Sequence, residues 1–198
     1  DYFIELTDVT TNCSIQIPIE LETPENPILL PSTIINVSCN GLSNGEIVLN
    51  LDPLTVSNPV YSYTLINEVT GLILQGPQSS PIFTNLSAGD YRGRVRSGRN
   101  CTDETVVSIT QPTIIINEPS AALQIDALDV TDLLCSASGV SDGSLIVNAT
   151  GGWGSNRYQL TQPDGTTIGP QTSSNFIGLS QSGGYLVEVI DINGCIVD

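Results

Sequence analysis

The chain repeats one pattern of residues at an interval close to the length of a small domain. Two similar blocks begin at Cys39 and Cys135, which are 96 residues apart. Two others end at Cys101 and Cys195, which are 94 residues apart. The closing block shares Phe83, Leu86, Gly89 and Tyr91 in one copy and Phe176, Leu179, Gly183 and Tyr185 in the other. A repeat of this length indicates a series of similar domains, each in contact mainly with its neighbours.

The repeat divides the 198 residues into three segments. Residues 1–27 are expected to be the C-terminal strands of a preceding repeat, because residues 2–13 match the end of the pattern. Residues 28–119 are expected to form a complete immunoglobulin-like repeat, and residues 120–198 a second one that lacks most of its last strand. Each complete unit is long enough to bury one thin core. We therefore expect the chain to be a piece of a longer polypeptide.

Short apolar runs rich in Val, Ile, Thr and Tyr, separated by Gly, Pro, Asn and Ser, predict strands and turns and almost no helix. In the first complete unit one strand is predicted before Cys39, and the others cover residues 46–51, 61–65, 71–74, 81–83, 91–96 and 101–110. Short strands at this spacing are typical of an antiparallel immunoglobulin-like β-sandwich. The prediction is an all-β protein of tandem sandwiches arranged as an extended rod.

A tyrosine follows a leucine and a glycine at the expected start of the sixth strand. Tyr91 and Tyr185 occupy this position in the two complete units, and Tyr2 occupies it in the N-terminal segment. In immunoglobulin-like sandwiches such a residue forms a tyrosine corner, in which the hydroxyl bonds to the backbone a few residues upstream. The three tyrosines are therefore predicted to be structural.

The chain is strongly acidic, with 21 Asp and Glu residues, five Lys and Arg residues and a formal net charge of −16. Such a surface repels nucleic acids and anionic lipids, and the sequence has no apolar run long enough to cross a membrane. The lack of His and Lys excludes Ser-His and Cys-His nucleophiles and lysine bases. We expect no catalytic residues and no enzyme, no nucleic acid partner and no direct membrane insertion.

The order of these motifs resembles the SprB-type repeat, which fills very long cell-surface adhesins of gliding bacteria in the Bacteroidota. In the first copy the resemblance rests on Cys39, Gly41, Gly45, Tyr61, Tyr63, Phe83, Leu86, Gly89, Tyr91, Val95 and Cys101. In the second copy it rests on Cys135, Asp142, Gly143, Gly151, Gly152, Tyr158, Phe176, Leu179, Tyr185, Val187, Val189, Asp191, Asn193, Gly194 and Cys195. The first copy departs from the pattern, because residues 97–101 read S-G-R-N-C in place of D-x-N-G-C and the Gly-Gly pair is missing.

The resemblance implies a segment of a long secreted adhesin that serves as a spacer and attachment filament in surface adhesion and gliding motility. It implies an extracellular location on the bacterial cell surface, after export across the outer membrane by type IX secretion. The implied partners are neighbouring repeats of the same chain, together with a surface polysaccharide or the outer-membrane gliding and secretion machinery. The alternative is an accessory immunoglobulin-like module, glycan-binding or spacer, of a secreted multidomain enzyme.

Five cysteines at recurring positions in small β domains indicate disulfides and an oxidising compartment. One alternative pairs them within each repeat, Cys39 with Cys101 and Cys135 with Cys195. The other pairs Cys39 with Cys195 across repeats and leaves Cys13, like the remaining cysteines, to pair with domains outside the chain. The sandwich topology favours the cross-repeat bond, because Cys39 and Cys101 are expected at opposite ends of strands roughly 17–20 Å long, too far apart for a disulfide. Free thiols are the third alternative.

No cofactor is expected, although acidic residues near the joints between repeats leave Ca²⁺ as a less favoured alternative. They are Glu22, Glu25 and Asn26 near the first joint and Asp126, Asp129 and Asp132 near the second. The sequence has no EF-hand and no glycine-rich calcium-binding spacing. The favoured interpretation is that these residues are solvated acids on strand faces, and no metal ligand is predicted.

Two further features are candidates for contact with a ligand or partner. One is a stripe of arginines that alternate on a predicted strand and point away from the core, Arg92, Arg94 and Arg96. The stripe could hold an acidic ligand, but pairing with acids such as Asp103 and Glu104 on the last strand is favoured. The other is Trp153, the single tryptophan, for which a half-buried position at a joint is favoured over stacking on a sugar.

Overall fold

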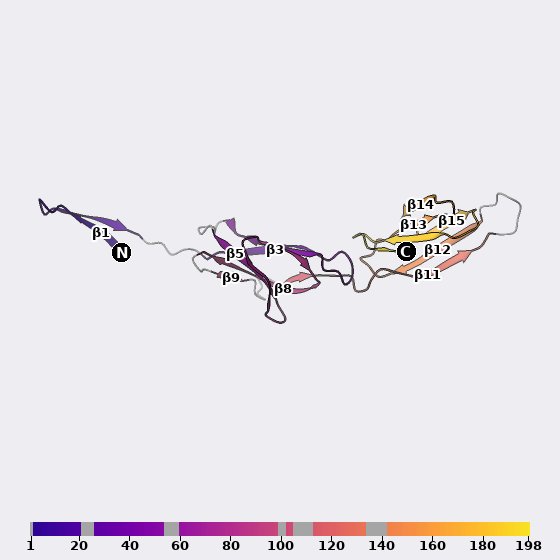
Figure 1. Cartoon of the computed structure of the whole chain (residues 1–198), viewed down its shortest axis with the longest axis horizontal. Coiled ribbons are helices and arrows are strands. Elements are labelled where there is room, and N and C mark those ends of the chain that lie inside the picture. Colours follow the sequence, from indigo (N-terminus) through magenta and orange to yellow (C-terminus); the bar gives the residue numbers. More distant parts are fainter. Residues whose placement is uncertain (1, 21–25, 54–59, 99–101, 105–112, 134–141) are drawn as a thin grey trace.

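The computed structural model describes residues 2–20, 26–53, 60–98, 102–104, 113–133 and 142–198. Within these residues the chain forms antiparallel β-sheets and no α-helix (Figure 1). The prediction of an all-β fold built from β-sandwiches is therefore confirmed. No helix that is long and apolar enough to span a membrane occurs in the described part of the chain.

The N-terminal segment forms a two-stranded ribbon. β1 (Tyr2–Thr7) and β2 (Ser14–Ile19) pair antiparallel, with Tyr2 opposite Ile19. Because side chains alternate along a strand, one face of the ribbon carries Tyr2, Ile4, Leu6, Ile15, Ile17 and Ile19. These side chains are largely exposed; Leu6, for example, is 65% accessible to solvent. The ribbon therefore has an apolar face that no other described segment covers.

The first sandwich is built from two sheets. One sheet has the order β3 (Leu29–Ile35), β4 (Gly45–Leu51) and β7 (Ile82–Leu86). The other has the order β10 (Ile114–Ile116), β8 (Gly89–Ser97), β5 (Tyr61–Asn67) and β6 (Ile73–Gln78), and β9 (Thr102–Glu104) also pairs with β8. β9 and β10 pair with opposite ends of β8, and both run antiparallel to it. Together they make up the last strand of the sandwich.

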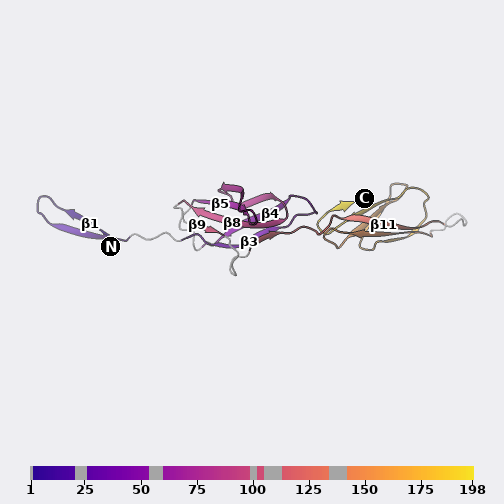
Figure 2. The ribbon, with the colours of Figure 1, turned by 90° about the horizontal axis from the view of Figure 1, so that it is seen from below.

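The second sandwich has the same strand order, and the two sandwiches lie end to end in both views (Figures 1 and 2). Its first sheet consists of β11 (Gln124–Thr131), β12 (Gly143–Thr150) and β15 (Asn175–Leu179). Its second sheet consists of β14 (Thr167–Gln171), β13 (Arg157–Thr161), β16 (Leu186–Ile190) and β17 (Ile196–Val197). In both units the fourth strand lies beside the third, whereas constant-type immunoglobulin domains place it in the other sheet. The fold is thus a variation on the immunoglobulin-like order.

Each sandwich has a hydrophobic core of its own between its two sheets. Phe83 and Phe176 hold equivalent positions in the two cores and are 0% and 2% exposed, and burial of such a side chain contributes about 1.5–3 kcal/mol. Along β8 the side chains of Tyr91 and Val95 point into the core. Between them Gly93 leaves room for Leu49, whose side chain would collide with any Cβ at that position. The two units therefore pack as separate domains.

Two tyrosines close the corners before the sixth strands. The hydroxyl of Tyr91 donates a hydrogen bond to the carbonyl of Ser87 at 2.7 Å, and that of Tyr185 donates to the carbonyl of Gln181 at 2.8 Å. Both acceptors lie a few residues upstream, which is the geometry of a tyrosine corner, and burial raises the pKa of Tyr91 above its ordinary value. The side chain of Tyr2 is 64% exposed, and its role as a corner stays a prediction.

Two glutamines form a repeated feature that was not predicted from the sequence. The side-chain amide of Gln78 donates to the carbonyl of Ile82 at 2.7 Å, and that of Gln171 donates to the carbonyl of Asn175 at 3.0 Å. Each glutamine follows a Gly-Pro pair in the fourth strand, and each acceptor lies on the fifth strand in the opposite sheet. These bonds join the two sheets at the same place in both sandwiches.

The last strand of the first sandwich differs most from its prediction. The described part of the predicted strand is β9, and residues 105–112 lie outside the described residues. The strand β10 was not predicted, because Pro112 is a typical strand terminator. The fourth strand also begins later than predicted, since Gly71, with φ +70° and its N–H bonded to Asn67, belongs to the preceding turn.

Replacement of Tyr91 by Phe tests the contribution of the tyrosine corner. The change removes only the hydroxyl, so the bond to Ser87 is lost and the free energy of unfolding should fall by about 1 kcal/mol. The matched change Tyr2→Phe removes an exposed hydroxyl and should alter it by less than about 0.5 kcal/mol. Urea denaturation under non-reducing conditions, followed by circular dichroism, measures both, and equal effects of the two changes would contradict the assignment.

Candidate functional site

A disulfide connects the two sandwiches. Cys39 follows β3 in the first sandwich, and Cys195 lies in the turn before β17 in the second. The two Cα atoms are 5.7 Å apart, within the usual range for a disulfide. Of the pairings considered from the sequence, this is the cross-repeat bond. The within-repeat pairings are absent, because they would require the same two cysteines.

Asp191 shapes the turn that presents Cys195 to the first sandwich. Its carboxylate is buried, and Oδ1 accepts hydrogen bonds from the backbone N–H groups of Asn193 and Cys195, both at 2.9 Å. Its Oδ2 accepts the backbone N–H of Trp153 at 2.9 Å. Gly194 has φ +84°, a conformation that residues with a Cβ rarely adopt. The D-x-N-G-C motif is therefore a turn whose aspartate satisfies three donors and positions the cysteine.

Trp153 contacts the first sandwich directly. Its indole Nε1 donates a hydrogen bond to the carbonyl of Val37 at 3.2 Å, and the side chain is half-buried. The preceding loop packs tightly, since a Cβ at Gly152 would lie 2.7 Å from Asp191 Oδ2. The backbone N–H of Gly152 also donates to the carbonyl of Ala121 at 3.0 Å. The Gly-Gly pair thus permits the close approach that places the indole at the joint.

The linker between the sandwiches is hydrogen-bonded on both sides. On the side of the first sandwich, the Asn40 amide donates to the carbonyl of Pro119 at 2.8 Å. The backbone N–H of Gly41 donates to the Glu118 carboxylate at 2.7 Å. On the other side, the loop at residues 151–152 packs against the linker. These bonds hold the linker against both domains.

The loop closed by the disulfide spans β4 to β16, and the two cysteines are 156 residues apart in sequence. In the chain-entropy account, closing a loop of this size stabilises the folded state by about 5 kcal/mol. The bond also changes the path of a pulling force. Tension applied to the two ends of the chain passes through the disulfide and bypasses the residues between Cys39 and Cys195. The joint therefore limits how far the protein can extend.

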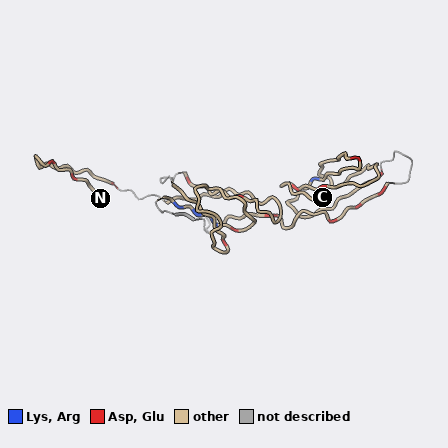
Figure 3. Tube along the Cα trace, viewed as in Figure 1, with Lys and Arg blue, Asp and Glu red and all other residues tan. Residues whose placement is uncertain are grey.

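Arg92, Arg94 and Arg96 occupy the less buried alternate positions of β8, as their alternation predicts. Figure 3 shows where the few basic residues lie among the acidic ones. Arg92 Nε lies 3.1 Å from the Glu68 carboxylate, an acid that was not considered from the sequence. The register places Arg94 opposite Glu104 and Arg96 opposite Thr102, and the side chains of residues 102–104 lie outside the described residues. The structure thus shows acid pairing for Arg92, and a role for the stripe in ligand binding stays a prediction.

The structure describes only some of the other cysteines and acids that the sequence analysis names. Cys13 is exposed and is a free thiol in the part of the chain that the structure describes. Four of the residues lie outside the described residues, namely Glu22, Glu25, Cys101 and Cys135. Among the acids near the second joint, Asp129 accepts a hydrogen bond from Asn148 at 2.9 Å, and Asp126 accepts one from Gln124 at 2.7 Å. In the described part of the chain, no group of three or more His, Cys, Asp or Glu residues is placed to hold a metal ion.

Force spectroscopy tests the mechanical effect of the disulfide. We consider a chain in which Cys13, Cys101 and Cys135 are replaced by Ser and force is applied at both termini. When oxidised, this chain should show no lengthening of the 156-residue loop. Reduction should release up to about 500 Å of extra length, as should the additional change Cys39→Ser without reduction. Release of that length from the oxidised chain would contradict the proposed force path.

One comparison with known proteins bears on this architecture. Residues 32–70 match the SprB repeat family, a range that covers most of β3 and all of β4 and β5 in the first sandwich. No curated protein matches the chain. The chain therefore contains a SprB-type repeat, at residues 32–70.

Proposed function

We propose that this chain is a repeat segment of a long, secreted bacterial cell-surface adhesin, and that it serves as a spacer and attachment filament in surface adhesion and gliding. The observation that carries the proposal is the Cys39–Cys195 disulfide, which joins neighbouring sandwiches end to end in a chain that contains a SprB-type repeat. A filament that attaches a cell must transmit tension along its length. A covalent bond across such a joint lets tension bypass β4 to β16, so these strands are not pulled apart.

The geometry of the joint supports a spacer role. The disulfide, the indole hydrogen bond to Val37 and the bonded linker all restrict movement between the two sandwiches. Repetition of such a joint produces an extended rod whose reach grows with the number of repeats. The neighbouring repeats of the same chain are thus the first partners of this segment, and no catalysis is needed for this role.

The chemistry of the chain agrees with an extracellular location. Structural disulfides persist in oxidising compartments and are rare in the cytosol. A net charge of −16 keeps a long filament soluble and discourages the edges of its sheets from pairing with other molecules. Export across the outer membrane by type IX secretion and movement by a gliding motor belong to the proposal through the SprB resemblance alone.

Antibody labelling tests the proposed location and role. Fab fragments raised against the purified 198-residue protein should label intact cells that express it, without permeabilisation. The same Fab should reduce attachment of these cells to glass, and beads coated with it should be carried along the cell surface. An unrelated Fab is the control. Labelling that requires permeabilisation would contradict a surface location, and attachment that is unchanged by the Fab would contradict the adhesin role.

A further inference from the structure

The basic residues of this chain all lie inside the loop that the disulfide closes. There are five of them, and all are arginines: Arg92, Arg94, Arg96, Arg99 and Arg157. Each lies between Cys39 and Cys195 in the sequence. Residues 1–38 and 196–198, which lie outside the loop, contain no Arg and no Lys. A protease of the trypsin class, which cleaves after Arg or Lys, can therefore cut this chain only inside the loop.

Cleavage inside the loop leaves the two ends of the chain joined. Hydrolysis of a peptide bond consumes one water and leaves a carboxylate and an amine, so it breaks no S–S bond. Cleavage at all five arginines still leaves residues 1–92 bonded to residues 158–198, because Cys39 belongs to the first piece and Cys195 to the second. The covalent connection between the ends thus survives any number of such cuts.

The folded structure also shields the arginines that it describes. β8 carries Arg92, Arg94 and Arg96, and it lies between β5 on one side and β9 and β10 on the other. Arg157 begins β13, which lies between β14 and β16. Arg99 lies outside the described residues. A strand in the middle of a sheet has to leave both neighbours before it can enter a protease active site, so cleavage there follows local unfolding.

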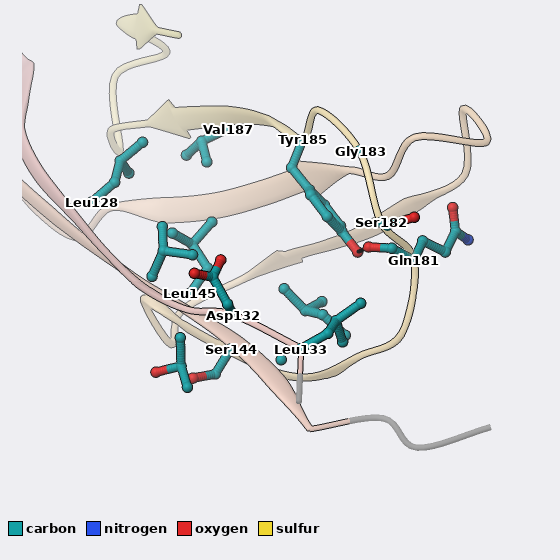
Figure 4. Close-up of a pocket in the computed structure, with 14 residues that line it drawn as sticks. Leu128, Asp132, Leu133, Ser144, Leu145, Gln181, Ser182, Gly183, Tyr185 and Val187 are labelled. Atoms are coloured by element: carbon teal, nitrogen blue, oxygen red, sulfur yellow. Dashed lines mark hydrogen bonds between the residues drawn. The ribbon is translucent and has the colours of Figure 1, made fainter. Parts of the chain in front are cut away.

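The pieces that a single cut produces are held together in two ways. After a cut at Arg157, β12 still pairs with β15, and the side chains of Leu145 and Val187 extend from opposite sheets into the same space (Figure 4). The disulfide also keeps the two pieces tethered to each other. A tether of this kind gives an effective concentration in the millimolar range. The cut sandwich therefore stays assembled.

We infer that this segment keeps its covalent continuity under attack by proteases of the trypsin class. Tension passes along the chain before Cys39, through the disulfide and along the chain after Cys195. These tension-bearing parts contain no site for such a protease. A cut in the loop breaks a bond that carries no tension, so the length of the segment under load does not change. The inference does not depend on the proposed role in adhesion.

Trypsin digestion of two matched variants tests the inference. Both are made in the chain with Cys13, Cys101 and Cys135 replaced by Ser, and both carry a tag without Arg or Lys at each end. Val69→Arg adds a site in an exposed turn inside the loop, and Thr10→Arg adds one in an exposed turn outside it. The cut Val69→Arg chain, denatured in urea, should keep both tags on one molecule until it is reduced. The cut Thr10→Arg chain should lose its N-terminal tag without reduction.

The additional change Cys39→Ser is the control for the disulfide. In the Val69→Arg chain it should release the N-terminal tag in urea without reduction. In the folded state, trypsin should cut at position 69 at least about tenfold faster than at the arginines of β8. Separation of the two tags in the oxidised Val69→Arg chain would overturn the inference. Equal rates at position 69 and in β8 would overturn the shielding by the sheet.

Exhaustive digestion of the unfolded chain gives a test that does not depend on the folding of a variant. The oxidised chain, with its free thiols blocked, is unfolded in urea and digested with trypsin. Mass spectrometry should then find residues 1–92 bonded to residues 158–198, and reduction should separate them. Recovery of the two peptides as separate species before reduction would overturn the inference.

Discussion

The covalent bond between Cys39 and Cys195 is the constraint on which the mechanical properties of this protein depend. It joins the end of the first strand of one sandwich to the turn before the last strand of the next. Its loop spans β4 to β16, so a pulling force bypasses these strands, whereas β3 before Cys39 and β17 after Cys195 lie in the force path. The first core therefore has to keep β3 in place, but most strands of both small domains carry no tension.

Cys195 can reach Cys39 because other residues hold its turn in place. Asp191 satisfies three backbone donors in the turn, and the glycines at 151 and 152 let a neighbouring loop approach that carboxylate. Trp153 then reaches across the joint to Val37. The conspicuous D-x-N-G-C and Gly-Gly motifs therefore belong to the joint, whereas Tyr91 and Tyr185 belong to the interiors of the domains. The sequence repeat coincides with one sandwich, whereas the disulfide that transmits force connects two successive sandwiches. The two units therefore have different boundaries.

Much of the fold follows from local patterns, whereas the joint and the strand ends depend on distant contacts. Alternation and turn residues are enough to predict the sheets, and the expected order of strands places Cys39 and Cys101 at opposite ends of one domain. Local patterns do not reveal β10, because Pro112 is a strong local signal for a strand end while its pairing with β8 is set by tertiary contact. They also miss the pairing of Arg92 with Glu68, because that acid lies on a neighbouring turn. The short Gly-Pro-Gln repeat was detectable in the sequence, but only the structure explains it.

A peptide map of the thiol-blocked protein tests the bond across the joint most directly. The protein is alkylated, digested without reduction by a protease that cleaves at acidic residues, and analysed by mass spectrometry. The structure predicts a linked pair of peptides that contain Cys39 and Cys195 and that separate on reduction. A link between Cys39 and Cys101, or alkylated thiols at both Cys39 and Cys195, would contradict the bond and the force path derived from it.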